Sequence, residues 1–183
     1  MATKVLDYVP QYDVMTCQSA AIARVIGSTN VRQVRNDLLR MGVPGDPTVM
    51  GLYLKDRVRE YRYHGQASLD DAIEALRDGW EIITHGDFTD AGHVIGLSAW
   101  NATTKKFQAE DPWFEFHFSD WSYYPYEIDG NDQQYSARGI WAACVANPIG
   151  AGAANAYELY VANPVLTAAQ YRQPGMWLHM IKN

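Results

Sequence analysis

Two cysteines occur in this 183-residue chain, and the first, Cys17, stands where a thiol can act as a nucleophile. Residues 17–27 have the pattern of a helix, which places Cys17 in the first turn with Thr16 as the expected N-cap. The partial positive charge and free N–H groups at a helix N-terminus lower the pKa of a thiol. Gln11 precedes Cys17 by six residues, and its amide, with the N–H of Cys17, can stabilise the oxyanion formed when sulfur attacks a carbonyl.

A thiol nucleophile needs a general base, and His93 is the best placed of the five histidines. It begins the apolar segment 93–100, which is typical of a buried strand, and a turn at 101–105 and a strand at 106–111 follow as a hairpin. Because His93 and Asp111 are equidistant from the turn, the pairing brings Asp111 within side-chain reach of His93. The spacing therefore predicts a Cys–His–Asp arrangement in which Asp111 orients the imidazole.

The order of these segments resembles that of papain-like cysteine peptidases, and more narrowly the branch whose peptidase domains trim bacteriocin leaders, with its stand-alone relatives. VPQYDVMTCQSAA resembles the opening motif of that branch, GHVIGLSAWN its histidine strand and FQAEDPW its Asp-Pro segment. The resemblance covers residues 8 to about 113. It implies that Cys17 is the nucleophile, His93 the base, Asp111 the orienting acid and Gln11 the oxyanion donor.

Two positions near the expected nucleophile and base are candidates for substrate contacts. Gln18 follows Cys17 where the family usually has glycine, so we expect Gln18 to narrow the cleft and touch the substrate. Asp87 and Asp90 precede His93 and are expected to be solvated, where Asp87 can recognise a cationic or amine-bearing substrate.

The segment 113–127 holds eight aromatic residues. Its three phenylalanines alternate, which predicts a strand with one apolar face. Trp121, Tyr123 and Tyr124 follow in turn-like sequence and are expected to be exposed. Trp113 and Trp121 are candidate substrate-binding residues, because exposed aromatic rings can stack on sugars or hold a peptide.

Metal binding is the main alternative for the same residue types, with Cys17, His85, His93 and Asp111 as the imaginable ligands. Their spacing matches no compact zinc pattern, and no two of them stand at i and i+4 of a helix. We therefore expect neither a metal nor a cofactor. Cys144 lies in an apolar segment and is predicted to belong to the core.

The rest of the pattern predicts one α+β domain spanning residues 1–183, mainly helical over 1–80 and mainly β over 81–183. The N-terminal helices are expected to pack on a C-terminal antiparallel sheet, as the papain-like resemblance also implies. The other predicted helices are 30–42, 48–63 and 68–80, with Asn30, Thr48 and Ser68 as N-caps and Asp71 completing a capping box with Ser68. The other predicted strands are 80–86, 139–148, 157–164 and 176–182, and residues 148–156 are expected to form a surface loop.

Composition argues against some classes of binding partner. A net charge of −6 argues against nucleic acid, because phosphate binding needs a basic face. No apolar run approaches the roughly 18 residues of a membrane span. The N-terminus lacks the apolar stretch of a secretory signal, so we expect synthesis in the cytoplasm with both thiols reduced.

Together these patterns favour a cysteine hydrolase that cleaves peptide or amide bonds through a thioester, and acyl transfer would need the same residues. A small acidic domain without a signal suggests a bacterial or bacteriophage enzyme, for which the peptidoglycan stem peptide is an attractive substrate. The expected place of action is then the cell wall, reached by release or carried by a phage particle. The alternative is a non-catalytic binding or structural module on the same fold, such as a phage-particle component or an inhibitor. The sequence does not fix the oligomeric state.

Overall fold

The computed structural model describes residues 4–124, 129–148 and 150–183. Its centre is a six-stranded antiparallel sheet with the strand order β1–β8–β2–β3–β4–β7, and β5 and β6 form a separate two-stranded sheet. The strands are β1 (Glu60–Ala67), β2 (Glu81–Gly86), β3 (His93–Asn101), β4 (Lys106–Glu110), β5 (Phe116–His117), β6 (Ser122–Tyr123), β7 (Gln133–Ser136) and β8 (Met176–Lys182). The helices are α1 (Cys17–Val25), α2 (Val31–Met41), α3 (Pro47–Lys55), α4 (Leu69–Arg77), α5 (Ala137–Trp141), the π-helix η1 (Ala142–Ala146), α6 (Gly152–Ala162) and α7 (Ala168–Tyr171). This arrangement confirms the α+β class.

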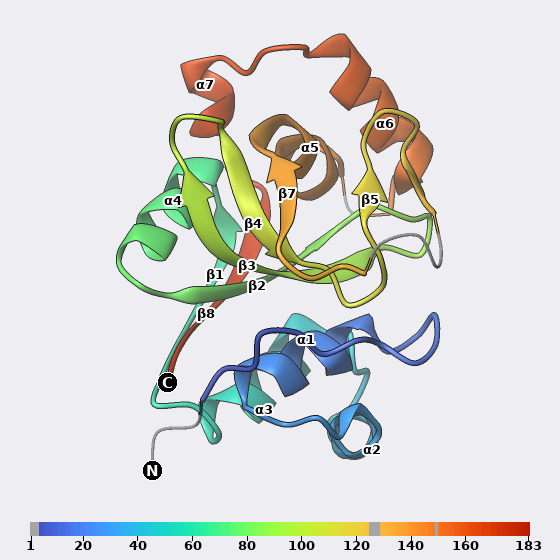
Figure 1. The fold of residues 1–183 in the computed structure, drawn as a ribbon, viewed down its shortest axis with the longest axis vertical. Helices are drawn as coiled ribbons and strands as arrows, with labels where there is room; N and C mark the ends of the chain where they lie inside the picture. Colours follow the sequence, from blue (N-terminus) through green and yellow to red (C-terminus); the bar gives the residue numbers. More distant parts are fainter. Residues whose placement is uncertain (1–3, 125–128, 149) are drawn as a thin grey trace.

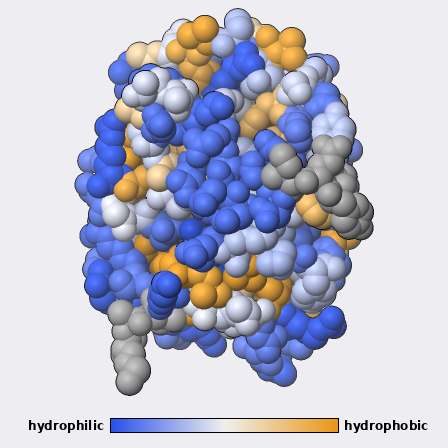
Figure 2. Space-filling model, in the orientation of Figure 1, coloured by the Kyte–Doolittle hydropathy of each residue, from blue (hydrophilic) through white to orange (hydrophobic). Residues whose placement is uncertain are grey.

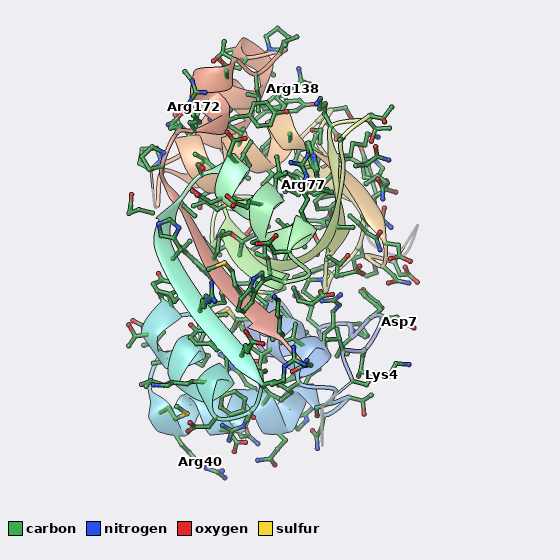
Figure 3. The ribbon with its side chains drawn as sticks, turned by 90° about the vertical axis from the view of Figure 1, so that its left-hand side faces the viewer. Lys4, Asp7, Arg40, Arg77, Arg138 and Arg172 are labelled. Atoms are coloured by element: carbon green, nitrogen blue, oxygen red, sulfur yellow. The ribbon has the colours of Figure 1, made fainter. Side chains whose placement is uncertain are left out.

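Helices cover both faces of the sheet (Figure 1). The first three helices, α1 to α3, form a layer on one face, and α4 to α7 lie on the other. From the side, β1 and β8 run next to each other from the α1–α3 layer toward the end of the molecule that carries Arg138 and Arg172 (Figure 3). On the face drawn in Figure 2, hydrophobic residues gather in a strip at the level where the α1–α3 layer meets the sheet. None of the helices described is both long and apolar enough to span a membrane.

The core consists of two hydrophobic clusters separated by the sheet. Successive side chains of a strand point to opposite faces, so a strand can supply both clusters. In β2, Ile82 belongs to the cluster under α4 and α5, whereas Ile83 belongs to the cluster under α1 to α3. In β3, Ile95 belongs to the cluster under α4 and α5, and Val94 belongs to the cluster under α1 to α3. The sheet is therefore the shared wall of the two clusters.

The predicted N-caps of α2 and α4 were correct. The Asn30 side chain accepts from the N–H of Gln33 at the start of α2, and Ser68 with Asp71 forms the predicted capping box of α4. α1 begins at Cys17 as predicted, but Thr16 does not cap it with its side chain. The Thr16 hydroxyl instead accepts from N–H groups in the preceding loop. These hydrogen bonds hold the loop before Cys17 in a compact turn.

The helix predicted over 48–63 was wrong in its second half. It ends at Lys55, and β1 follows from Glu60. The N-cap is Asp46, whose carboxylate accepts from two N–H groups of the first turn, and not Thr48. Pro47 in the first turn explains the earlier start, because its fixed φ suits that position. β1 is an edge strand with few buried residues, so it lacks the alternation that marks a half-buried strand.

The strands predicted at 139–148 and 157–164 were also wrong. The first segment forms most of α5 and η1, and the second belongs largely to α6. A short apolar run fits a buried strand and a buried helix equally well, and here several alanines favour the helix. The loop expected over 148–156 is shortened because α6 begins at Gly152, and residue 149 lies outside the described residues. The part after residue 80, which was predicted to be mainly β, therefore also contains helices, so the division between a helical and a β part is less sharp than predicted.

Candidate active site

The thiol of Cys17 lies in a cleft between the helical layer and the sheet. The cleft has a volume of about 280 Å³, and its lining includes Cys17, Gln18 and His93. Cys17 is the first residue of α1, so the N-terminal end of that helix points into the cleft. The residues expected to supply the nucleophile and the base therefore share one cavity.

His93 and Asp111 form a buried pair behind the thiol. Nε2 of His93 lies 2.7 Å from Oδ1 of Asp111, and both side chains are almost fully inaccessible to water. The Cys17 sulfur interacts with the His93 side chain, and this interaction lowers the pKa of the thiol. Because Nε2 faces Asp111, Nδ1 is the ring nitrogen left for the sulfur. The three residues thus form one chain of contacts from sulfur to carboxylate.

The hairpin brings His93 and Asp111 together by a different register from the one predicted. β3 and β4 pair Gly96 with Glu110, and the register shifts between Leu97 and Ala99. Asp111, just beyond the last pair, is therefore a diagonal neighbour of His93 and not its direct partner. Diagonal neighbours on one sheet face remain within reach of long side chains. The predicted contact is present, although His93 and Asp111 are not equidistant from the turn as predicted.

Four donors hold the Asp111 carboxylate. Oδ1 accepts from the His93 ring and from the backbone N–H of Trp113, at 2.7 and 3.0 Å. Oδ2 accepts from the hydroxyls of Tyr123 and Tyr135, at 2.7 and 2.9 Å. Burial and the charge of Asp111 raise the pKa of both tyrosines, so each hydroxyl remains a donor. No local pattern in the sequence marks Tyr123 or Tyr135 for this role.

The electrostatics of the site favour charge separation between sulfur and imidazole. Burial alone raises the pKa of the Cys17 thiol, but the hydrogen bond and charge of His93, with the N–H groups of Val94 and Gln18, lower it overall. Burial opposes the charged form of His93, but Asp111 and the contact with Cys17 raise the pKa of its ring. The two shifts together favour a thiolate beside an imidazolium.

Gln18 lines the cleft of Cys17 as expected, whereas the Gln11 side chain lies at a different cavity. Nε2 of Gln11 donates to the carbonyl oxygen of Asp13 at 2.7 Å, and Gln11 lines a separate cavity of about 580 Å³. Its backbone N–H donates to the carbonyl of Pro112, which ties the loop to the Asp111 segment. Gln18 contacts the sulfur directly: the Cys17 thiol donates a hydrogen bond to Oε1 of Gln18 at 3.3 Å. The oxyanion role of Gln11 and the substrate contact of Gln18 stay predictions.

The remaining candidate binding residues separate into one that lines a cavity and two that do not. Trp113 lines the 580 Å³ cavity beside Gln11. Trp121 is buried, and its ring N–H donates to the carbonyl oxygen of Asp87, so the expected exposure of Trp121 was wrong. Asp87 is also buried, with its carboxylate accepting from the Asn147 amide at 2.6 Å. Both form part of the packing against η1 and α6.

The aromatic segment forms less strand than predicted. β5 contains only Phe116 and His117. Tyr123 is half-buried beside Asp111, whereas Tyr124 is exposed as predicted. Residues 125–128 of this segment lie outside the described residues.

His85 is a second imidazole in the cleft of Cys17. Its ring stacks on Trp177, with centroids 5.6 Å apart. Burial and then the charge of His93 lower the pKa of His85 to about 4, so the His85 ring is neutral near pH 7. Cys144 is buried, as predicted. In the part of the chain described, no cluster of three or more His, Cys, Asp or Glu side chains is arranged to hold a metal ion.

The chain matches no protein-family model and no curated protein.

Proposed function

We propose that this protein is a papain-like cysteine hydrolase of peptide or amide bonds. The observation that carries the proposal is the chain of contacts from the Cys17 thiol through the His93 ring to the Asp111 carboxylate. The position of Cys17 at the N-terminus of α1 supports it, because that end of a helix stabilises a thiolate. The order of the Gln, Cys, His and Asp-Pro segments, which resembles that of papain-like peptidases, supports it further.

The proposed reaction forms and then hydrolyses a thioester. The Cys17 thiolate attacks the carbonyl carbon, and the Cys17 N–H stabilises the resulting oxyanion. The Gln11 amide joins it as a second donor once it has turned away from the Asp13 carbonyl. The His93 imidazolium gives its proton to the leaving amine as the C–N bond breaks. Neutral His93 then takes a proton from water, whose oxygen attacks the thioester and releases the acid and the thiolate. Asp111 holds the ring in position throughout.

Peptides are the proposed substrate class, and the peptidoglycan stem peptide is the first candidate for an assay. An amine in place of water would convert the same thioester into a new amide, so acyl transfer belongs to the same proposal. A fold and a site of this kind do not fix the substrate. For this reason the first test measures the nucleophile itself.

The test is the pH dependence of Cys17 alkylation by iodoacetamide, followed by mass spectrometry. In the wild type, we expect rapid labelling that persists well below pH 8, because the imidazolium stabilises the thiolate. His93→Ala should move the pH midpoint up toward that of a free thiol, and Asp111→Asn should move it in the same direction. His64→Ala is the matched control, since His64 is exposed on β1, outside the cleft.

Cys144 supplies an internal control in every sample. It is buried, and burial raises the pKa of its thiol, so it should not react while the protein is folded. Slow Cys17 labelling with an ordinary thiol pH profile in both the wild type and His93→Ala would contradict the hydrolase. A non-catalytic binding module on this fold would then be the better account.

A further inference from the structure

An arginine in the cleft of Cys17 has no partner for its charge among the described residues. Arg35 lies on α2 and is half-buried in the wall of the cleft. Within residues 4–124, 129–148 and 150–183 its guanidinium has no ion pair, hydrogen bond or ring contact. Other arginines are engaged: Arg24 pairs with Glu81, and Arg32 lies over the Tyr12 ring. A cation left unpaired in a cleft is available to a ligand.

Apart from Cys17 and the two histidines, Arg35 is the only ionisable side chain among the described residues that line the cleft. No aspartate or glutamate is among the described residues that line it. The His85 ring is neutral near pH 7, and a Cys17 thiolate, the His93 imidazolium and the Asp111 carboxylate behind the ring together carry one net negative charge. The whole chain carries a net charge of −6, so the cationic Arg35 is a local feature of the cleft wall. A negatively charged group is the natural complement of the Arg35 guanidinium.

The rim of the cleft is aliphatic. Val14 and Met15, from the loop before Cys17, are 67% and 59% exposed, and Val43, after α2, is 71% exposed. Single exposed apolar side chains are common, but three that line the same cleft form a surface suited to an apolar group. The rim therefore suits an apolar group of a ligand, and Arg35 suits a negatively charged group of the same ligand.

We propose that the cleft selects substrates in which a carboxylate lies beside Arg35 and an aliphatic group packs on Val14, Met15 and Val43. This proposal rests on the proposed hydrolase function, because it concerns the group that occupies the cleft next to the thiol. A guanidinium binds a carboxylate through two parallel N–H donors, which gives both affinity and orientation. The carboxylate has two sources, the free C-terminus of a peptide and an acidic side chain.

The test uses thiol-reactive probes that differ only in charge. N-iodoacetyl-leucine carries an aliphatic side chain and a free carboxylate, and N-iodoacetyl-leucinamide is its neutral counterpart. The quantity measured is the ratio of the Cys17 alkylation rates with the two probes. Arg35→Gln should lower this ratio about threefold to tenfold, the effect of losing one partly exposed charged contact. Arg32→Gln, on the same helix but outside the cleft, should lower it by less than twofold.

A second pair of probes identifies the source of the carboxylate. It consists of N-iodoacetyl-glutamic acid α-amide and N-iodoacetyl-glutamine α-amide. An Arg35-dependent ratio in the leucine pair assigns a C-terminal carboxylate, and one in the glutamate pair assigns an acidic side chain. Ratios that Arg35→Gln leaves unchanged in both pairs would overturn the proposal. An equal loss in Arg32→Gln would also overturn it, because the effect would then be a general field.

These outcomes are distinct from failure of the hydrolase itself. If Cys17 reacts with the neutral probes as an ordinary thiol, the proposed function fails. If Cys17 reacts rapidly with the neutral probes but the charge ratio does not depend on Arg35, only the substrate selection fails. Far-ultraviolet circular dichroism and the absence of Cys144 labelling show in each variant that the protein is folded.

Discussion

At the scale of single residues, His179 is a buried imidazole that takes no part in the proposed chemistry. Its ring is fully inaccessible, with Nδ1 2.7 Å from the Tyr61 hydroxyl. Nε2 has no hydrogen-bond partner in the described part of the chain. The rings of Tyr63 and Trp177 complete its surroundings. Burial lowers the pKa of His179 to about 3, because no acid compensates the desolvation of its charged form.

This burial predicts a loss of stability in mild acid. Below a pH of about 6.5 the unfolded chain binds a proton at residue 179, whereas the folded protein does not until its pKa of about 3 is approached. The stabilising contribution is therefore complete above the unfolded pKa and is lost as the pH falls. Between pH 5.5 and 4, one such group lowers the free energy of unfolding by about 1.4 kcal/mol per pH unit.

Urea unfolding at several pH values tests this effect. His179→Gln retains an acceptor for Tyr61 but cannot take up the proton, so its pH slope should be shallower than that of the wild type by about 1.4 kcal/mol per unit. His64→Gln should keep the wild-type slope, since His64 is exposed. Equal slopes in the wild type and His179→Gln would show that the His179 ring is not buried as a neutral group.

Some residues of the candidate site could be predicted from the sequence and others could not. Cys17, His93 and Asp111 each stand at an end of a helix or strand, and such ends can be read from periodicity and turn residues. Tyr123 and Tyr135 could not be assigned, because their contacts with Asp111 depend on where the tertiary structure places β6, in the two-stranded sheet, and β7, at the edge of the main sheet. The nucleophile and base are local features, whereas the residues that hold Asp111 are set by tertiary structure.

At the scale of elements, Arg24 joins the helix of the nucleophile to the sheet. Its Nη1 lies 2.9 Å from the Glu81 carboxylate of β2. Its Nη2 lies 3.9 Å from the Glu110 carboxylate, the residue before Asp111. Glu110 also accepts from the Ser98 hydroxyl and the Asp132 N–H. Arg24 and Glu110 are both buried, so neither charge can turn to water.

Arg24→Met should destabilise the protein by about 3–5 kcal/mol, because it leaves Glu110 buried without a cation. Glu110→Gln in the Arg24→Met background should recover part of that loss by removing the unpaired charge. Arg40→Met is the matched control: Arg40 is 73% exposed and pairs with Asp37 on α2, so its loss should cost less than about 1 kcal/mol. The measurement is the free energy of unfolding in urea. Similar losses in Arg24→Met and Arg40→Met would mean that the buried cluster does not anchor α1.

Elements could be predicted where a local signal singles out one structure. The Asn30 cap and the Ser68–Asp71 capping box are such signals, because each satisfies named backbone groups at a helix start. The apolar run 139–148 carries no such signal, since a helix and a strand can both bury it. Which one forms depends on the neighbours, and here the segment packs as α5 and η1 against α6 and the sheet. Tertiary packing therefore decided the elements that the sequence left ambiguous.

At the scale of the whole molecule, the candidate site lies where two clusters meet. Cys17 belongs to the cluster of the α1–α3 layer, and Cys144 belongs to the cluster on the opposite side of the sheet. His93 and Asp111 come from the sheet that separates the clusters. The geometry of the site consequently depends on how firmly the helical layer stays attached to the sheet.

Cys17 and Cys144 lie on opposite sides of the sheet. We expect the reactivity of both thiols to change in a single unfolding transition. β2 and β3 supply side chains to both clusters, so neither cluster can open without disturbing the other. Pulses of iodoacetamide at increasing urea concentration, read by mass spectrometry, should show Cys17 losing its enhanced low-pH reactivity at the concentration where Cys144 becomes labelled. Both midpoints should equal that of circular dichroism, as two-state unfolding requires.

Single-thiol variants, Cys17→Ser and Cys144→Ala, keep the two signals separate in this experiment. Loss of the Cys17 signal at a urea concentration where Cys144 is still protected would contradict the single transition. It would mean that the helical layer detaches from an intact sheet, carrying the nucleophile away from His93. Arg24→Met should move the protein toward that behaviour, because it removes the buried link between α1 and the strands. Coincident midpoints in the wild type that separate in Arg24→Met would identify Arg24 as the group that couples the helical layer to the sheet.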